Sequence, residues 1–467
     1  MRRQVLDARG LRLVSLIALV AALAGTAGAA ARVEQRGPTW ILENGRLRVV
    51  VDAQAGALAV TDKAANHEWK QMAKKAGQQA PRFRNVRSKG EPPCGLSFEG
   101  DFGWTQGKPS TLLVTLTLPD ESSDLRVEAD MADRKAAVEY LPFLEPLVLD
   151  TPQAALAVAD YCNGHLYPLS AKPRLHKWFS MSRLDMPWVG VCDGAKGLGY
   201  AIIVETADDG AIEVKPRREG DKELSAPQVL WTACRKQFAY PRRLVYHFAS
   251  QGGYVVLAKR YREYAKAQGL IVPFSEKLKR NPNLARLFGA PDVWGDASLK
   301  FARAAKAAGV EKMLIHGRTS PEDMKAIKEL GYLTSEYDNY TDVFGLKPGQ
   351  EVDATHDRVP ENVVLNADGK RMTAWLTFDK KQQYMKRCPS FWVPSAKVVV
   401  PKALEKHPFV GRFIDVTTAE DLYECHDPQH PLTRSQKRQC GVDLLGYVRS
   451  LGLVVGGEHG IWWAVPQ

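Results

Sequence analysis

The chain has 467 residues, of which 45% are hydrophobic and 25% are charged. These values are typical of globular proteins and exclude extended disorder, and the length suffices for two domains. The formal net charge is +11, but the basic residues are spread along the sequence, and their densest cluster, Lys277–Arg280, matches no recognition motif. The charge therefore indicates a solvated basic surface, and nucleic-acid binding is not predicted.

The N-terminus has the pattern of a secretory signal. An apolar run, Leu13–Leu23, is followed by small residues at Ala29–Ala31 that suit cleavage. Four arginines precede the run: Arg2, Arg3, Arg9 and Arg12. The run is too short for a comfortable transmembrane helix, and no later segment is long enough to span a bilayer. We expect residues 1–31 to be a signal peptide and the protein to be secreted or periplasmic, with no transmembrane segment.

Residues 32–270 are rich in predicted strands. Trp40–Val51 places a polar turn between two apolar strands, and Leu125–Ala129 alternates with the period of a half-buried strand. Short strands broken by Gly, Pro and Asp predict a β-sandwich. From Gly252 to Gly269 apolar residues recur at helical spacing, which predicts a helix that closes this domain. Residues 271–284 are predicted to be a linker.

Strands and helices alternate from residue 285 to residue 467. The predicted strands are 287–294, 312–316, 332–340, 411–417 and 453–458. The predicted helices are 297–308, 320–331, 398–406 and 433–452, and a loop-rich insertion fills most of 341–395. Repeated strand–helix units predict a parallel sheet of the (β/α)8 barrel type. Because five strands do not close such a barrel, we expect it to be incomplete at the C-terminus.

Two carboxylates lie at the ends of successive predicted strands. Asp415 ends the strand in Gly-Arg-Phe-Ile-Asp, and Glu458 follows Leu-Val-Val-Gly-Gly. In a β/α barrel the carboxyl ends of neighbouring strands meet at one site. Cleavage of a glycosidic bond needs two such acids, one to attack or stabilise the sugar cation and one to protonate the leaving oxygen. The pair therefore predicts a glycoside hydrolase.

The segment from Gly411 to Gly460 resembles the catalytic barrel of glycoside hydrolase family 129. It reads Phe-Ile-Asp-Val-Thr-Thr-Ala, then Cys-His-Asp-Pro-Gln-His-Pro-Leu-Thr-Arg, then Gly-Leu-Val-Val-Gly-Gly-Glu-His-Gly. This family contains exo-acting α-N-acetylgalactosaminidases and is related to the endo-acting enzymes of family 101. It also has an N-terminal sandwich of the galactose-mutarotase type and a helix like Tyr261–Tyr264.

The resemblance extends over about residues 35–467 and implies specific roles. Asp415 would be the nucleophile and Glu458 the general acid/base of a retaining mechanism. The implied substrate is α-linked N-acetylgalactosamine or a related galacto-configured sugar on a glycan or glycoconjugate.

Other polar and aromatic residues near predicted strand ends are candidates for substrate binding, because amides, acids and rings suit a sugar. Trp375, in the insertion, is placed to act from a lid. The candidates are Trp294, His316, Glu336, Asp338, Asn339, Tyr340, Trp375 and His459.

Two rival functions remain open at this point. One is a truncated, non-catalytic glycan-binding protein, favoured by the incomplete barrel. The other is a metal-dependent hydrolase, which needs several His and Asp residues clustered at strand ends. Only His316 lies at such a position. No cofactor is predicted, and neither calcium binding nor the oligomeric state can be decided from the residues.

The cysteines do not point to a function. Seven are present without a Cys-x-x-Cys spacing, and pairing of Cys425 with Cys440 would close a short loop. Cys425, His426 and His430 could bind a metal only from a loop, because Pro428 excludes a helix that would pair the two histidines. Such a loop site is an alternative that the sequence leaves undecided.

Overall fold

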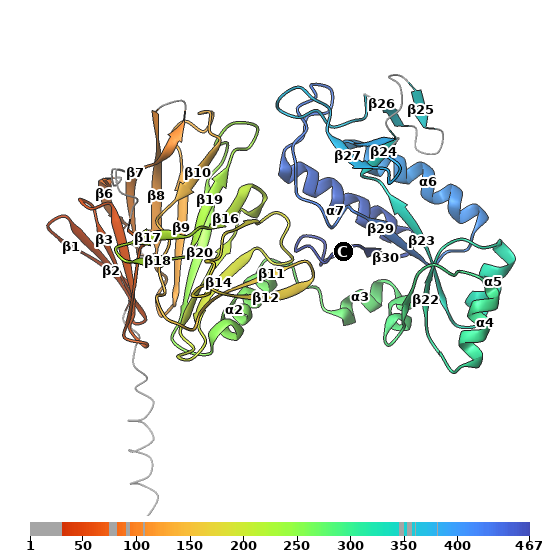
Figure 1. Cartoon of the computed structure of the whole chain (residues 1–467), viewed down its shortest axis with the longest axis horizontal. Coiled ribbons are helices and arrows are strands. Elements are labelled where there is room, and N and C mark those ends of the chain that lie inside the picture. Colours follow the sequence, from red (N-terminus) through yellow and green to blue (C-terminus); the bar gives the residue numbers. More distant parts are fainter. Residues whose placement is uncertain are drawn as a thin grey trace, which may run out of the picture.

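The computed structural model describes residues 30–73, 82–89, 94–105, 108–344, 350–352, 357–359, 361–380 and 382–467. Within them, a lobe of antiparallel strands precedes a mixed lobe of helices and parallel strands (Figure 1). Residues 1–29 of the expected signal peptide lie outside the described residues. Among the described helices, none combines the length and apolar character needed to cross a membrane.

The first lobe contains three main antiparallel sheets with a common core. The nine-stranded sheet has the order β12-β11-β14-β15-β20-β9-β8-β7-β6. Its strands are β6 (Arg84–Lys89), β7 (Gly95–Thr105), β8 (Lys108–Thr117), β9 (Asp124–Asp130), β11 (Ala154–Asp160), β12 (Asn163–Pro168), β14 (Trp188–Asp193), β15 (Gly199–Val204) and β20 (Arg242–Ala249). The predicted β-rich character of this part is confirmed.

Two smaller sheets pack with the large one. The five-stranded sheet contains β1 (Arg32–Arg36), β2 (Thr39–Glu43), β3 (Leu47–Asp52), β4 (Ala57–Asp62) and β5 (His67–Lys70). The four-stranded sheet contains β10 (Tyr140–Phe143), β19 (Pro227–Thr232), β16 (Gly210–Val214) and β13 (Lys177–Ser180), and β17 (Arg217–Glu219) pairs with β18 (Lys222–Leu224). Alternating burial along β3 directs Val49 and Val51 into the core that all three sheets share.

Helix α2 (Gly253–Ala267) closes this lobe, as predicted. Leu257, Tyr261 and Ala265 recur at a spacing of four and are buried in a cluster with Trp188 of β14. The predicted linker that follows is ordered into α3 (Phe274–Arg280) and a 3₁₀ helix at Pro282–Leu287. Asn281 explains the second turn, because its side chain accepts a hydrogen bond from the amide of Asn283.

The second lobe is built on a parallel sheet whose five strands lie in chain order and curl as in half of a barrel (Figure 1). They are β21 (Asp292–Val293), β22 (Leu314–His316), β23 (Leu333–Asn339), β29 (Gly411–Asp415) and β30 (Val454–Gly457). The helices are α4 (Leu299–Ala307), α5 (Pro321–Glu329), α6 (Trp392–Lys406) and α7 (Arg434–Ser450). The predicted parallel sheet is confirmed, although its first strand is much shorter than 287–294.

The start of α5 and α7 follows directly from the sequence. Ser320 accepts a hydrogen bond from the amide of Asp323, and Thr433 forms a capping box with Gln436. Helix α6 begins six residues before the predicted position, at Trp392 rather than Val398. Pro394 argues against a helix at this point of the sequence. In the first turn, however, a proline leaves the helical hydrogen bonds intact.

The described residues of the insertion before α6 contain strands where a loop was predicted. They form a sheet of β24 (Asp342–Phe344), β28 (Gln383–Lys386) and β27 (Thr373–Leu376), and an antiparallel pair of β25 (Gln350–Val352) and β26 (Asp357–Val359). A 3₁₀ turn, Pro389–Phe391, then leads into α6.

Charged residues join the two lobes. Asp208 accepts hydrogen bonds from Arg438 and from Ser435 of α7. Asp209, 1% exposed, lies 2.5 Å from Arg434 and also contacts Arg242, which is itself buried. The start of α7 is therefore held against the turn between β15 and β16 of the first lobe.

Candidate active site

Asp415 lies at the end of β29, where the backbone turns sharply. Val416 has a φ of 60°, and the amide of Thr417 donates to the carbonyl of Asp415 over 2.6 Å. A left-handed conformation is rare for a β-branched residue and costs on the order of 1–3 kcal/mol, and such strain is concentrated at functional sites. Here it ends the strand immediately after the carboxylate.

Glu458 lies at the matching position of the next strand. The last paired residues of β29 and β30 are Ile414 and Gly457, so Asp415 and Glu458 each follow the final pair. Neighbouring strands are about 4.8 Å apart. Side chains two residues apart along a strand point to the same face, so both acids are in phase with Phe413. The two carboxylates are thereby brought to one end of the sheet.

Close packing accounts for Gly457 before Glu458. A Cβ atom at Gly457 would lie 2.5 Å from Oγ1 of Thr418, which belongs to the segment after Asp415. Only glycine allows the two strand ends to approach this closely. The side chain of Glu458 is 43% exposed, and its Oε1 lies 3.9 Å from Nε2 of His459.

Tyr337 contacts Asp415 from the neighbouring strand β23. Its hydroxyl donates a hydrogen bond of 2.6 Å to Oδ2 of the carboxylate. Burial and this bond to Asp415 raise the pKa of Tyr337, so the phenol stays protonated and remains a donor. Asn339, a predicted binding residue, pairs with Asp415 in register, but its oxygen accepts bonds from Thr341.

An aromatic cluster lies beside this pair. Trp294 stacks on His316 with ring centres 4.0 Å apart, and Phe413 meets both rings edge-on. His316 is 5% exposed, and its Nε2 lies 2.6 Å from Oδ1 of Asp292. Burial lowers the pKa of His316 despite that carboxylate. Trp294 remains 48% exposed, which leaves an apolar ring face available to a sugar.

Three other predicted binding residues lie on the opposite face of β23. Glu336 and Asp338 both pair with Arg412, whose side chain is fully buried. Tyr340 is 2% exposed and donates to Oδ2 of Asp338. These contacts compensate a buried charge, and they face the core formed with α6 and α7 rather than the face of Phe413.

Trp375 is placed in the insertion and His459 at the junction of the lobes. Trp375 is 46% exposed and stacks on Tyr384 with ring centres 4.3 Å apart. The ring of His459 meets Tyr161 edge-on at 5.5 Å. Tyr161 belongs to the hairpin between β11 and β12, where it and Cys162 both have left-handed backbones. The first lobe therefore reaches the residue that follows Glu458.

Tyr337, Phe413 and Tyr161 were not among the sequence candidates. The two-residue period of β23 and β29 groups Tyr337 and Phe413 with Asp415, and this signal was available. No sequence signal indicated Tyr161, because it lies almost three hundred residues before His459.

The curled parallel sheet follows an antiparallel β lobe, and Asp415 and Glu458 lie at the ends of two adjacent strands. Barrel glycoside hydrolases carry their acids at such strand ends. Residues 306–466 match the family described as glycosyl hydrolases related to GH101 family, GH129. This match confirms the resemblance inferred from the sequence. No curated protein matches the chain.

Several similar solved structures are of α-N-acetylgalactosaminidase NagBb from Bifidobacterium bifidum. The GalNAc complex has a TM-score of 0.74 at 15% identity and covers 93% of this chain and 78% of NagBb. The ligand-free structure has a TM-score of 0.71 at 15% identity, with coverage of 93% and 79%. The Gal-NHAc-DNJ complex has a TM-score of 0.72 at 16% identity, with coverage of 93% and 77%. At this identity the similarity shows a shared fold.

Proposed function

We propose that the protein is a retaining glycosidase that removes α-linked N-acetylgalactosamine, or a related galacto-configured sugar, from glycans. The observation that carries this proposal is the register of β29 and β30, which places Asp415 and Glu458 at the same level of adjacent strands. Retaining glycosidases need carboxyl groups roughly 5 to 5.5 Å apart. Adjacent parallel strands, about 4.8 Å apart, suit that separation.

In the proposed mechanism, ionised Asp415 attacks the anomeric carbon while protonated Glu458 donates its proton to the leaving oxygen. The bond to the aglycone breaks and a glycosyl ester forms on Asp415. Glu458, now a carboxylate, takes a proton from water, which attacks the same carbon and releases Asp415. Two inversions at that carbon give net retention.

The surrounding residues have separate roles in this proposal. Tyr337 orients the nucleophile through its hydrogen bond, and the ring of Trp294 offers an apolar surface to the sugar. His459, which contacts Tyr161 of the first lobe, lies beside the acid. The choice of sugar is supported by the family match and by the fold shared with NagBb.

The test is hydrolysis of nitrophenyl α-N-acetylgalactosaminide, with the anomer of the first product followed by NMR. We expect release of the α-anomer, and weaker hydrolysis of the matching α-galactoside. A β-anomer as first product would exclude retention. Binding of the sugar with no turnover would instead indicate a glycan-binding protein.

We also propose that residues 1–31 direct export, which N-terminal sequencing of the mature protein tests.

A further inference from the structure

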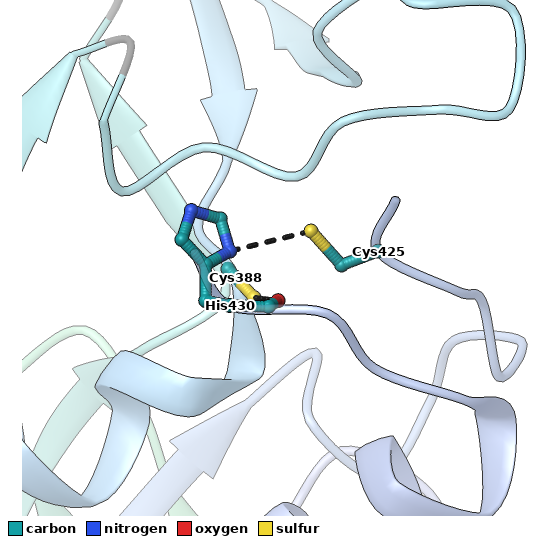
Figure 2. Close-up of side chains that lie close together, drawn as sticks. All are labelled: Cys388, Cys425 and His430. Carbon is teal, nitrogen blue, oxygen red and sulfur yellow. Dashed lines mark hydrogen bonds between the residues drawn. The ribbon is translucent and has the colours of Figure 1, made fainter. Parts of the chain in front are cut away.

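A second cluster of reactive side chains lies away from the proposed acids. Figure 2 shows the ring of His430 directed toward the sulfur of Cys425, with Cys388 beside them, its Sγ 3.7 Å from the carbonyl oxygen of His430. Their ligand atoms all lie within 4.8 Å of one another, and Nδ1 of His430 is 3.3 Å from Sγ of Cys425. Both cysteines are fully buried, and His430 is 9% exposed. Water therefore has little access to the three groups.

The tautomer of His430 is determined by its other ring nitrogen. Nε2 lies 2.8 Å from the carbonyl oxygen of Glu361, and a carbonyl only accepts hydrogen bonds. Nε2 therefore carries the proton, and Nδ1 presents its lone pair to the sulfur of Cys425. A metal-bound histidine in proteins is held in this way, with its second nitrogen donating to a carbonyl or carboxylate.

We propose that Cys388, Cys425 and His430 bind a zinc ion. Thiolates combined with an imidazole select zinc over calcium or magnesium, which prefer oxygen ligands. In a tetrahedral zinc site, sulfur and nitrogen ligands lie about 3.5 Å apart, close to the separation of Cys425 and His430. Binding releases the protons of both thiols. Ser390, whose Oγ is 3.7 Å from Sγ of Cys388, or a water molecule completes the coordination.

The proposed ion would tie the insertion to the segment that follows Asp415. Cys388 lies between β28 and α6, whereas Cys425 and His430 lie between β29 and α7. Val364 and Leu432 pack in the same buried cluster as the two cysteines. Because the three ligands come from two separate segments, the role proposed for the ion is to hold those segments together. The ion would therefore stabilise the loop that connects the strands bearing the two acids.

The test begins with zinc analysis of the full chain purified without chelators. We expect about one zinc ion per chain, lost in Cys388→Ser, Cys425→Ser and His430→Gln. Cys440→Ser and His426→Gln are matched controls from the same region and should keep the ion. Cobalt replacing zinc should give the intense thiolate charge-transfer absorption of a tetrahedral site, and Cys388→Ser should reduce it.

A second measurement needs no variant that must fold. In the wild-type chain, zinc should protect Cys388 and Cys425, but not exposed Cys162, from alkylation, and a chelator should remove that protection. A disulfide between Cys388 and Cys425 in the purified chain, with no zinc bound, would overturn the proposal. Free thiols without zinc, or zinc retained in both cysteine variants, would overturn it as well.

Discussion

The hydroxyl of Tyr337 donates a hydrogen bond of 2.6 Å to the carboxylate of Asp415 across neighbouring strands. A hydrogen bond to a charged group contributes about 1.5–3 kcal/mol, and in the proposed mechanism this one orients the nucleophile. Tyr337→Phe should therefore lower kcat on the nitrophenyl substrate by roughly tenfold to a hundredfold, with little change in Tm. Tyr254→Phe, at an exposed position of α2, is the control. Equal activity of both variants would show that Tyr337 does not contribute to catalysis.

The two acids should respond differently to the leaving group. Asp415→Asn should abolish hydrolysis of every substrate, because no ester can form. Glu458→Gln should spare substrates with activated leaving groups, which need no protonation, and should abolish cleavage of natural glycans. Rates on both classes of substrate test this, and an equal loss on both would argue against Glu458 as the acid.

Asp338 should affect stability more than substrate binding. Its carboxylate accepts a bond of 2.7 Å from buried Arg412, and removing one partner of a buried pair costs about 3–5 kcal/mol. Asp338→Asn should thus lower the free energy of unfolding by up to this amount, while KM of the folded fraction is unchanged. A stable variant with a raised KM would show that Asp338 binds the sugar.

Val416→Asn tests the strain after Asp415. Asparagine tolerates the left-handed backbone that Val416 adopts, so the variant should be more stable by about 1 kcal/mol. Denaturant unfolding measures the change. The same substitution at Val255, an exposed position of α2, should give a small loss of stability instead. Destabilisation at Val416 equal to that at Val255 would show that no strain is stored there.

The attachment of α2 should weaken in acid through Asp124. Burial opposes ionisation of Asp124, but hydrogen bonds from His247 and Arg260 prevail and lower its pKa to about 2. Its stabilisation is present above the unfolded pKa of 3.8 and is lost as the pH falls through about 2. Asp124→Asn should cost about 2 kcal/mol at neutral pH and flatten this acid limb in unfolding curves. If the loss of stability in acid is the same in Asp124→Asn as in the wild type, Asp124 is not the group responsible for it.

The sequence predicted the elements whose signals are local. Ser320 and Thr433 mark the starts of α5 and α7, and the apolar strands that precede Asp415 and Glu458 form as expected. The orientation of strand residues was harder to predict, because the polar residues at the end of β23 alternate between faces. Pairing with buried Arg412 accounts for Glu336 and Asp338, and only the tertiary structure shows that pairing.

Contacts between segments far apart in the sequence could not be predicted from local patterns. The sequence relates Cys425 to Cys440 and to His430, which all follow Asp415 in the same segment. In the fold Cys425 also lies beside Cys388, which comes from the end of the insertion. Likewise Tyr161 reaches His459 only because the lobes are joined. Such contacts depend on the packing of whole elements, which residue spacing does not encode.

The central claim is that Asp415 and Glu458 act on one glycosidic bond. The most direct test is mass spectrometry of Glu458→Gln mixed with an activated α-N-acetylgalactosaminide. Without its general base the variant should form the glycosyl ester but release it slowly. The account predicts one N-acetylhexosamine bound to the peptide that contains Asp415, and none in the double variant with Asp415→Asn. Rapid turnover without a bound sugar, or a sugar on another peptide, would contradict it.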